Sequence, residues 1–579
     1  MVKLANILEF IKKQPLSILF FVVLTTSFFW HLSFRNRHFQ ECDSAGTYNM
    51  IYDFPKSALS YAALTYPEGN LLKPETVNKI LENPTVKNQI EKYFSRYPKE
   101  QISERLSKLN IFAVLRFGYI QIVSSLNLPH QLLGFFAVPL GSTYSAGPGL
   151  MYTLITGSNT SYESFMSGVL FLNILVFHLS VLLLYFTAKK LKLSPLAAIL
   201  PCLLMLFSIS LYSTAFHTGS TLWNIASGIL FLFFVAKYWN TEKQFKYISI
   251  ISAILVFFNY LIAFYWLAFV LMYVSKTIAG QTLKLKPVFK ALWGVIKKQK
   301  LAIFAFFICG TIFFQPGQSA RGATSLNTLP SDLYYIVLNF FSFFNHTQST
   351  IILEFILGAF IIIFVTKYVF SKTSAERENQ TAVKNVLKWL FIIFWLLVFT
   401  KVLSLVPTRH ILFLSPLWFL GLMLALEKYT ARLRLFYALL IVVIISAFGF
   451  LGVLQRQLFV KDLTAQISLP KDIENIGVYD CSFNLVNKNW QNPVKIDFIN
   501  PKNFEVGKTY LYLSQVETFD TALVQWQKNY NLDLEILNQT NQFNSTFFVA
   551  FNPNPKKFLY SRPNSLFETK FKVISIAPK

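Results

Sequence analysis

The chain has 579 residues, of which 54% are hydrophobic, 17% aromatic and only 14% charged, and its mean hydropathy is +0.45. A soluble protein carries about a quarter charged residues, so a chain built only of soluble domains is excluded. The 22 glycines, 23 prolines and four cysteines are too few for a collagen, a disordered chain or a disulfide scaffold. The formal charge of +25 invites a nucleic-acid partner, and the positions of the basic residues decide that question.

Apolar stretches long enough to cross a membrane recur along the chain, since a membrane helix needs about 20 mostly apolar residues. The first, at 15–34, follows two lysines and has no small-residue cleavage site after it, so we interpret it as a retained anchor. The 246–275 stretch has lysines beyond both ends and predicts a hairpin that turns near Asn259 and Tyr260. With these, about eleven spans are predicted; the other stretches are 166–188, 194–213, 218–236, 300–315, 349–370, 386–405, 409–427 and 433–454.

Basic residues are concentrated on one side of these spans. The predicted cytoplasmic segments hold 24 Lys and Arg against 5 Asp and Glu, and the loop 276–300 alone has seven lysines and no acid. The long first outer loop, 35–165, has 12 against 10, and the tail, 455–579, has 14 against 11. By the positive-inside rule the N-terminus is cytoplasmic and the tail lies outside. No basic soluble domain remains for a nucleic acid, so we expect no such partner.

The outer segments carry their own patterns. Apolar residues at helical spacing between 77 and 94 predict short helices, either on the membrane surface or in a cap packed on itself. The stretch 109–128 contains Arg116 and either dips into the bilayer or crosses it. Strand patterns at 508–513, 532–537 and 546–551, and a helix pattern at 519–530, predict a small α/β domain in the tail. The predicted fold is thus a polytopic α-helical membrane domain, 1–454, followed by a soluble α/β domain, 455–579.

The first candidate for chemistry is ECDSAGTYNM at 41–50, directly after the first span. Glu41 and Asp43 lie close to the predicted membrane–water boundary. A carboxylate there can act as a general base on a hydroxyl or as a metal ligand. The alternative is that Asp43 caps a helix beginning at Ser44.

Two further segments face the same side. In TYSAGPGLMY, 143–152, the Gly-Pro-Gly turn either lets the backbone approach a ligand closely or forms an ordinary corner between a loop and a helix. In the loop 316–348, Arg321 either clamps a lipid phosphate, with His346 beside it, or only lies at the interface.

The last candidates are cations at span ends. Arg409 and His410 begin a late span and either bind an anion or snorkel to the interface. His217, in the turn 215–220, carries the weakest signal of the set, because histidines at helix ends usually only form hydrogen bonds. These candidate residues are considered together because the predicted topology places them all on the outer face of the membrane.

In this order the features resemble the GT-C class of integral membrane glycosyltransferases, in the protein O-mannosyltransferase and aminoarabinose-transferase branch. The resemblance rests on the acidic motif after the first span, the turn Gly-Pro148-Gly-Leu-x-Tyr, the late Arg409-His410…Pro416 and the outer tail. It implies a sugar donor linked to polyprenyl phosphate. Relatives have two adjacent acids where this chain has Glu41-x-Asp43, so no metal ligand is assigned and the cofactor stays open.

The resemblance also implies roles for the candidate residues. Asp43, with Glu41, would be the catalytic pair that takes or orients the proton of the acceptor hydroxyl. The implied donor-phosphate residues are Arg321, Arg409, His410 and His346, and the implied substrate-binding residues are Tyr48, Tyr144, Pro148 and His217.

The expected function is therefore an inverting transfer of a sugar from its lipid carrier to a hydroxyl of a lipid, glycan or protein. We expect it on the outer face of a bacterial inner membrane. One alternative is a polysaccharide ligase or polymerase, for which histidines rather than Asp43 would be essential. Another is a transporter or flippase of lipid-linked sugars, which would need ionisable groups near the bilayer midplane and inverted repeats. The spans are nearly free of buried charge, with Glu354 near the outer end of its span as the main exception, and no repeated halves are seen. A third alternative is a purely structural membrane subunit.

Overall fold

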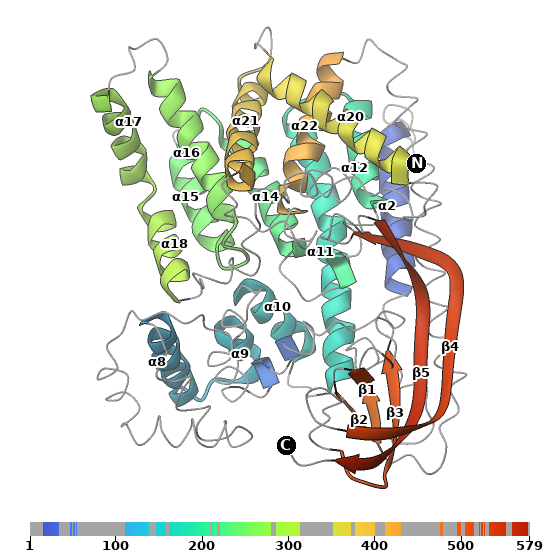
Figure 1. Cartoon of the computed structure of the whole chain (residues 1–579). Coiled ribbons are helices and arrows are strands. Elements are labelled where there is room, and N and C mark those ends of the chain that lie inside the picture. Colours follow the sequence, from blue (N-terminus) through green and yellow to red (C-terminus); the bar gives the residue numbers. More distant parts are fainter. Residues whose placement is uncertain are drawn as a thin grey trace, which may run out of the picture.

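The computed structural model comprises a bundle of helices, a layer of shorter helices beyond one end of it and a C-terminal sheet (Figure 1). The residues that the structure describes are 15–33, 47–48, 50–52, 54, 111–137, 146–157, 161–208, 211, 214–216, 221–241, 243–278, 285–312, 351–371, 377–399, 412–429, 475–478, 495–498, 504–514, 520, 523–524, 526, 532–551 and 559–576.

Among these residues, four helices are long and apolar enough to cross a membrane. They are α2 (Pro15–Ser33), α11 (Tyr162–Lys190), α14 (Thr221–Tyr238) and α21 (Glu378–Phe399). Their composition is what the high hydrophobic fraction predicts, and the chain is a mostly helical protein with membrane-spanning character.

Six more apolar helices pack in the same bundle. They are α12 (Pro195–Leu206), α15 (Gln244–Leu255), α16 (Ile262–Ile278), α18 (Lys300–Ile312), α20 (Ile351–Phe370) and α22 (Ser415–Tyr429). Each overlaps a stretch predicted to cross, whereas the stretch 433–454 lies outside the described residues. The count of eleven crossings therefore stays a prediction.

The predicted break in the 246–275 stretch is confirmed. α15 ends at Leu255 and α16 begins at Ile262. The side chain of Asn259 is 1% exposed, and its Oδ1 accepts the backbone N–H of Leu261 at 2.6 Å. Asn side chains that bond the backbone two residues on create turns of this kind, so the apolar run divides into two helices here.

Polar side chains attach α2 to α11 inside the bundle. Tyr185 donates its hydroxyl hydrogen bond to Ser17 Oγ at 2.9 Å. Farther along, Ser27 Oγ lies 3.5 Å from His31 Nε2 and 3.4 Å from His178 Nε2. Both histidines are buried, 1% and 5% exposed. Neither histidine is among the residues predicted for the site, although ionisable side chains in membrane spans are energetically costly and usually functional.

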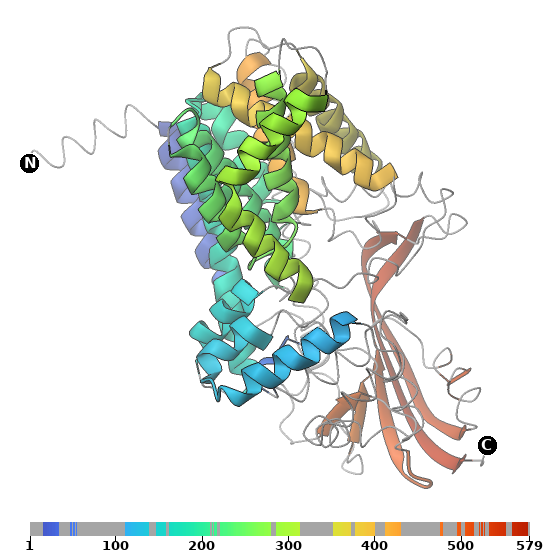
Figure 2. The ribbon, with the colours of Figure 1, turned by 90° about the vertical axis from the view of Figure 1, so that its left-hand side faces the viewer.

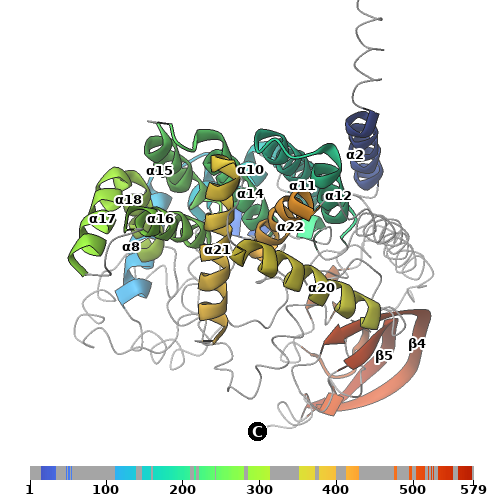
Figure 3. The ribbon, with the colours of Figure 1, turned by 90° about the horizontal axis from the view of Figure 1, so that it is seen from above.

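Hydrogen bonds gather several connecting segments at one end of the bundle. The main chain after α11 accepts side-chain bonds from the start of α21, at Leu191 O from Gln380 (2.8 Å) and at Lys190 O from Asn379 (3.1 Å). Glu427, near the end of α22, accepts the N–H of Ser194 at 2.8 Å. We call this the lysine end, because Lys189, Lys190, Lys192, Lys384 and Lys428 lie in these segments. Figure 3 looks down on it, with α11, α12, α14 and α22 side by side.

One helix was not expected from the sequence. The lysine-rich loop predicted at 276–300 contains α17 (Leu285–Lys298), which packs Val295 against Val270 and Val274 of α16. Gln299 separates α17 from α18 and joins the elements around it. Its side chain accepts from Trp266 Nε1 at 3.0 Å and donates to the carbonyl of Phe245 at 2.8 Å.

The layer beyond the other end holds α8 (Ile111–Ser125), α9 (His130–Ala137) and α10 (Ala146–Thr156), as Figures 1 and 2 show. At 15 residues or fewer, these helices are shorter than the roughly 20 residues that a span needs. Within the described part of 111–157, no helix therefore has the length to cross the membrane. The predicted surface helices between 77 and 94 lie outside the described residues.

The C-terminal sheet has the strand order β2-β1-β3-β5-β4. β1 (Asn475–Val478) runs parallel to β2 (Lys495–Phe498) and to β3 (Thr509–Ser514), while β5 (Leu559–Ile576) is antiparallel to β3 and to β4 (Leu532–Phe551). The strand predicted at 508–513 is confirmed as β3. The two strands predicted at 532–537 and 546–551 are one strand, β4, with register shifts along it.

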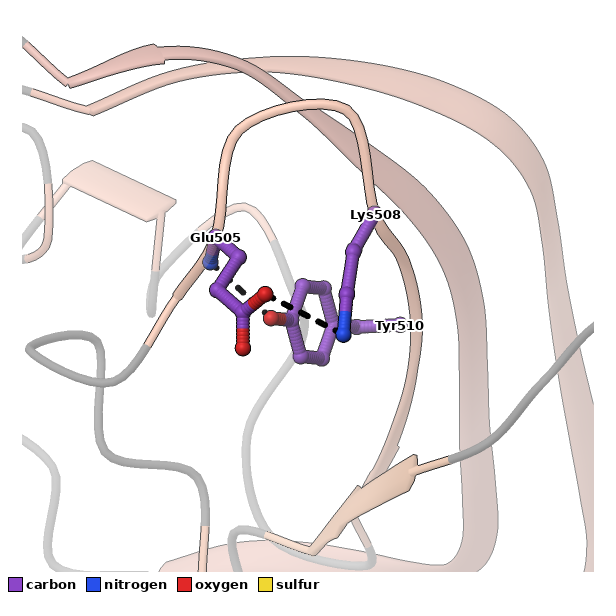
Figure 4. A network of polar contacts seen from close by, with 3 residues as sticks. All are labelled: Glu505, Lys508 and Tyr510. Carbon is purple, nitrogen blue, oxygen red and sulfur yellow. Dashed lines mark hydrogen bonds and ion pairs between the residues drawn. The ribbon is translucent and has the colours of Figure 1, made fainter.

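An aromatic cluster closes one face of this sheet: Phe504, Tyr510, Tyr512, Trp526 and Phe571. The turn before β3 is held by the hydroxyl of Tyr510, which accepts the N–H of Glu505 at 3.0 Å (Figure 4). Lys508 Nζ also lies 3.1 Å from the Glu505 carboxylate. Since both charged side chains are exposed, this ion pair contributes little stability, and the tyrosine fixes the turn.

Candidate functional site

The residues directly after the acidic motif lie in contact with the helix of the Gly-Pro-Gly segment, about a hundred residues away in sequence. The hydroxyl of Tyr52 lies 3.0 Å from Thr156 Oγ1 and 3.4 Å from the carbonyl oxygen of Gly157. Ile51, fully buried, packs with Tyr152 and Phe165 in one apolar cluster. The chain just after the acidic motif thus packs on α10 at the end of the bundle opposite the lysine end.

An aromatic group surrounds this junction. The rings of Tyr48 and Tyr52 have centroids 4.8 Å apart, one helical turn from each other, and Tyr48 meets Phe165 at 5.5 Å. The ring of His130, from α9, lies 5.2 Å from that of Tyr52. Tyr48, Tyr52 and His130 are each only partly buried. Partial burial raises the pKa of Tyr48, and the neighbouring Tyr52 raises it further, so the hydroxyl stays neutral at physiological pH.

A buried hydrogen-bond chain supports the aromatic group. Trp223 Nε1 donates to the hydroxyl of Tyr152 at 3.0 Å, and Tyr152 donates to Asn173 Oδ1 at 3.1 Å. The three residues come from α14, α10 and α11, so the chain ties α10 to two bundle helices. Burial raises the pKa of Tyr152 to about 12, although the bonds from Trp223 and to Asn173 lower it in part.

The start of α10 lies against the turn between α15 and α16. Gly147 donates its N–H to the carbonyl oxygen of Phe257 at 2.6 Å, and a Cβ at Gly147 would lie 2.6 Å from the ring of Phe258. Only glycine allows this approach. Pro148 is buried in the first turn of α10, where a missing N–H costs no helical bond. Gly147, Pro148 and Gly149 thus lie in the first turn of α10, where the backbone closely approaches the turn between α15 and α16.

Two short 3-10 helices, which are neighbours of other candidate residues in the sequence, lie at the same end of the bundle. η3 (Thr214–Phe216) directly precedes His217 in sequence and contacts α11 and α14. η7 (Leu412–Leu414) follows His410 and contacts α14, and its Phe413 carbonyl accepts the hydroxyl of Tyr265 at 2.6 Å. η3 and η7 lead into α14 and α22, whose far ends belong to the lysine end.

Most of the predicted site residues lie outside the described residues. This applies to Glu41, Asp43, Tyr144, His217, Arg321, His346, Arg409 and His410. Tyr48 and Pro148 are described, Tyr48 partly buried in the aromatic group and Pro148 buried inside α10. Among the described residues no group of three or more His, Cys, Asp or Glu side chains could hold a metal ion. The catalytic and phosphate-binding roles stay predictions.

Several residues of this end were missed by sequence reasoning. Tyr52 follows Tyr48 at helical spacing, which is a signal that could have been used. His130, Tyr152, Asn173 and Trp223 come from four different elements, and no local pattern connects them. No protein-family model, no curated protein and no solved structure matches the chain, so its assignment rests on these residues.

Proposed function

We propose that the chain is a membrane glycosyltransferase that takes a sugar from a polyprenyl-phosphate carrier and passes it to an acceptor hydroxyl. The single observation that supports this proposal is the contact of Tyr52, two residues after the acidic motif, with Thr156 of α10 at 3.0 Å. Asp43 precedes Tyr48 by five residues, so their Cα atoms lie within about 18 Å whatever path the chain takes. In this proposal the base acts next to the aromatic group at the end of the bundle.

The aromatic group suits a sugar chemically. Tyr48, Tyr52 and His130 combine apolar ring faces with polar edges, and they are partly exposed. Aromatic side chains of this kind pack against apolar surface while their polar ends form hydrogen bonds. A sugar ring offers both, with C–H groups on its faces and hydroxyls on its rim. Tyr48 would contact the substrate, while Tyr52 would hold the motif against α10.

The chemistry would be an in-line displacement. An acceptor oxygen attacks the anomeric carbon while Asp43 takes its proton, the bond from that carbon to the phosphate oxygen breaks, and the polyprenyl phosphate leaves with inversion. Arg409 and His410 lie just before η7 in sequence, and η7 is packed against α14. They are therefore the cations best supported for the leaving phosphate, and Arg321 and His346 are further candidates.

The test is Asp43→Asn in membranes supplied with a radiolabelled polyprenyl-phosphate sugar. General-base catalysis contributes roughly 10² to 10⁴-fold, so transfer should fall by that factor while the protein stays folded. Asp520→Asn is the matched control, because Asp520 is an exposed carboxylate of the C-terminal region and should leave transfer unchanged. Full transfer by Asp43→Asn, or equal losses in the two variants, would overturn the assignment.

A flippase of lipid-linked sugars is a second candidate, and one observation favours it. His31 and His178 are ionisable, buried and bridged by Ser27 within two candidate spans, and such groups mark transport pathways. Proteoliposomes containing the lipid-linked sugar separate the two functions. A flippase would move the carrier between leaflets without consuming it, and His178→Leu would stop that movement. A transferase would release carrier phosphate only when an acceptor is present.

A further inference from the structure

The exposed side of α17 combines two aromatic side chains with lysines. Phe289 and Trp293 are 65% and 59% exposed and lie one helical turn apart, on the same face. Lys290 and Lys297 are exposed beside them, and Lys297 Nζ lies 5.6 Å from the centre of the Trp293 ring. The opposite side of α17 is covered, since Val295 is buried against α16. The fold thus leaves one face of this helix without a protein partner among the described residues.

The neighbouring helix, α18, exposes an apolar stripe that ends at the junction with α17. α18 continues from α17 after Gln299 and exposes Leu301, Phe304 and Phe307 at 50%, 62% and 67%. That apolar stripe, without charge, is typical of a helix side that faces hydrocarbon. Lys297, Lys298 and Lys300 follow one another at the junction, and Lys298 Nζ lies 4.7 Å from the ring of Phe245 at the start of α15. The lysines therefore lie where the apolar stripe of α18 ends, and α17 continues from there alongside the C-terminal half of α16.

The positive charge of α17 indicates that its partner is anionic. The segment 276–300 has seven lysines and no acid, and no described carboxylate pairs with Lys290 or Lys297. Trp and Phe beside lysines are typical of helices that lie at the membrane–water interface. Clusters of lysines next to a span attract anionic lipids, at about 1 kcal/mol for each lysine near the surface, which corresponds to about fivefold in affinity.

We propose that the Phe289–Trp293 face of α17 binds the head groups of anionic phospholipids at the surface of the membrane that holds the bundle. The aromatic rings insert between head groups and upper acyl chains, and Lys290 and Lys297 contact the phosphates. The proposal is independent of the glycosyltransferase assignment, because it concerns α17 and not the end of the bundle with the aromatic group.

The test uses the full chain in nanodiscs of phosphatidylcholine that contain phosphatidylglycerol, with bromine on the acyl chains of one lipid at a time. Bromine quenches nearby tryptophan, and subtracting the signal of Trp293→Phe isolates Trp293. We expect stronger quenching from brominated phosphatidylglycerol than from brominated phosphatidylcholine at equal amounts. High salt should reduce this preference, because salt screens exposed charges.

Two double variants test whether the lipid preference depends on the lysines of α17. Lys290→Gln with Lys297→Gln should weaken the preference for phosphatidylglycerol by roughly 30-fold in relative affinity. Lys189→Gln with Lys190→Gln removes the same charge from the end of α11, which lies apart from α17 in Figure 3, and should leave the quenching of Trp293 unchanged. Equal quenching by the two lipids would overturn the proposal, and so would the absence of quenching, which is the result for a face that meets water or another protein.

Discussion

The hydroxyl of Tyr52 lies 3.0 Å from Thr156 Oγ1 and joins the segment after the first span to α10. Removing this hydroxyl should disturb the position of the acidic motif more than the stability of the protein. Tyr52→Phe should cost about 1 kcal/mol of unfolding free energy and reduce transfer roughly tenfold, because misplaced catalytic groups lose rate steeply. The measurements are thermal unfolding in detergent and sugar transfer in membranes.

Tyr247→Phe is the control for this change. Tyr247, at the start of α15, stacks its ring on that of Tyr238, and its hydroxyl makes no hydrogen bond to the described residues. If Tyr52→Phe retains full transfer, the hydroxyl does not position the motif.

Gly147 should not tolerate a side chain. In Gly147→Ala the new Cβ would overlap the ring of Phe258 at 2.6 Å, and overpacking typically costs about 1–3 kcal/mol. Gly294→Ala on α17 is the matched control, because its Cβ would meet nothing within 4 Å. There alanine should raise stability by about 0.5–1 kcal/mol through helix propensity. Adding Phe258→Leu should restore part of the loss in Gly147→Ala, and no recovery would mean that the contact is not the cause.

Tyr152 predicts a loss of stability at alkaline pH. Its pKa is raised to about 12 in the folded protein, mainly by burial, from an ordinary value of 10. The neutral hydroxyl is favoured in the folded state, so its contribution is complete below pH 10 and disappears as the pH rises to about 12. Tyr152→Phe should flatten this part of the pH profile of the melting temperature. It should also cost about 1–3 kcal/mol at neutral pH, because Asn173 Oδ1 is left buried without that donor. An unchanged alkaline slope would contradict this assignment.

Glu427 should stabilise the start of α12 from α22. Its carboxylate accepts the N–H of Ser194 at 2.8 Å, and a negative charge at a helix N-terminus is favourable by about 0.3–1 kcal/mol, or more where it is partly buried. Glu427→Ala should therefore lower the melting temperature in detergent, whereas Glu535→Ala, at an exposed position of β4, should not. Equal effects of the two substitutions would show that this cap is unimportant.

The sequence predicted the parts of the fold that depend on local chemistry. The long apolar runs became α2, α11, α14 and α21, because a run of apolar residues specifies a helix in a membrane wherever it packs. The break at Asn259 was also predictable, since its side chain bonds the backbone two residues on.

The elements that were missed depend on contacts distant in sequence. The sequence predicts two strands where β4 runs because residues 538–542 are polar, and only pairing with β5 shows one strand. The lysines of 276–300 predict a loop where α17 lies, and only the packing of α17 on α16 shows which of its sides is covered. In the candidate site, Tyr52, His130 and Trp223 converge from separate elements, and no spacing in the sequence connects them.

The shortness of α12 and α15 has a consequence for the lipid around the protein. Each has 12 residues, which is about 18 Å of helix, against a hydrocarbon layer of about 30 Å. Both present large apolar side chains outward, Leu196 at 47% and Ile254 at 50% exposure. A bilayer in contact with helices too short for it becomes thinner locally, and this hydrophobic mismatch costs free energy for each ångström. The melting temperature should therefore rise when the acyl chains of the surrounding lipid are shortened, and the protein should accumulate in the thinner regions of a mixed membrane.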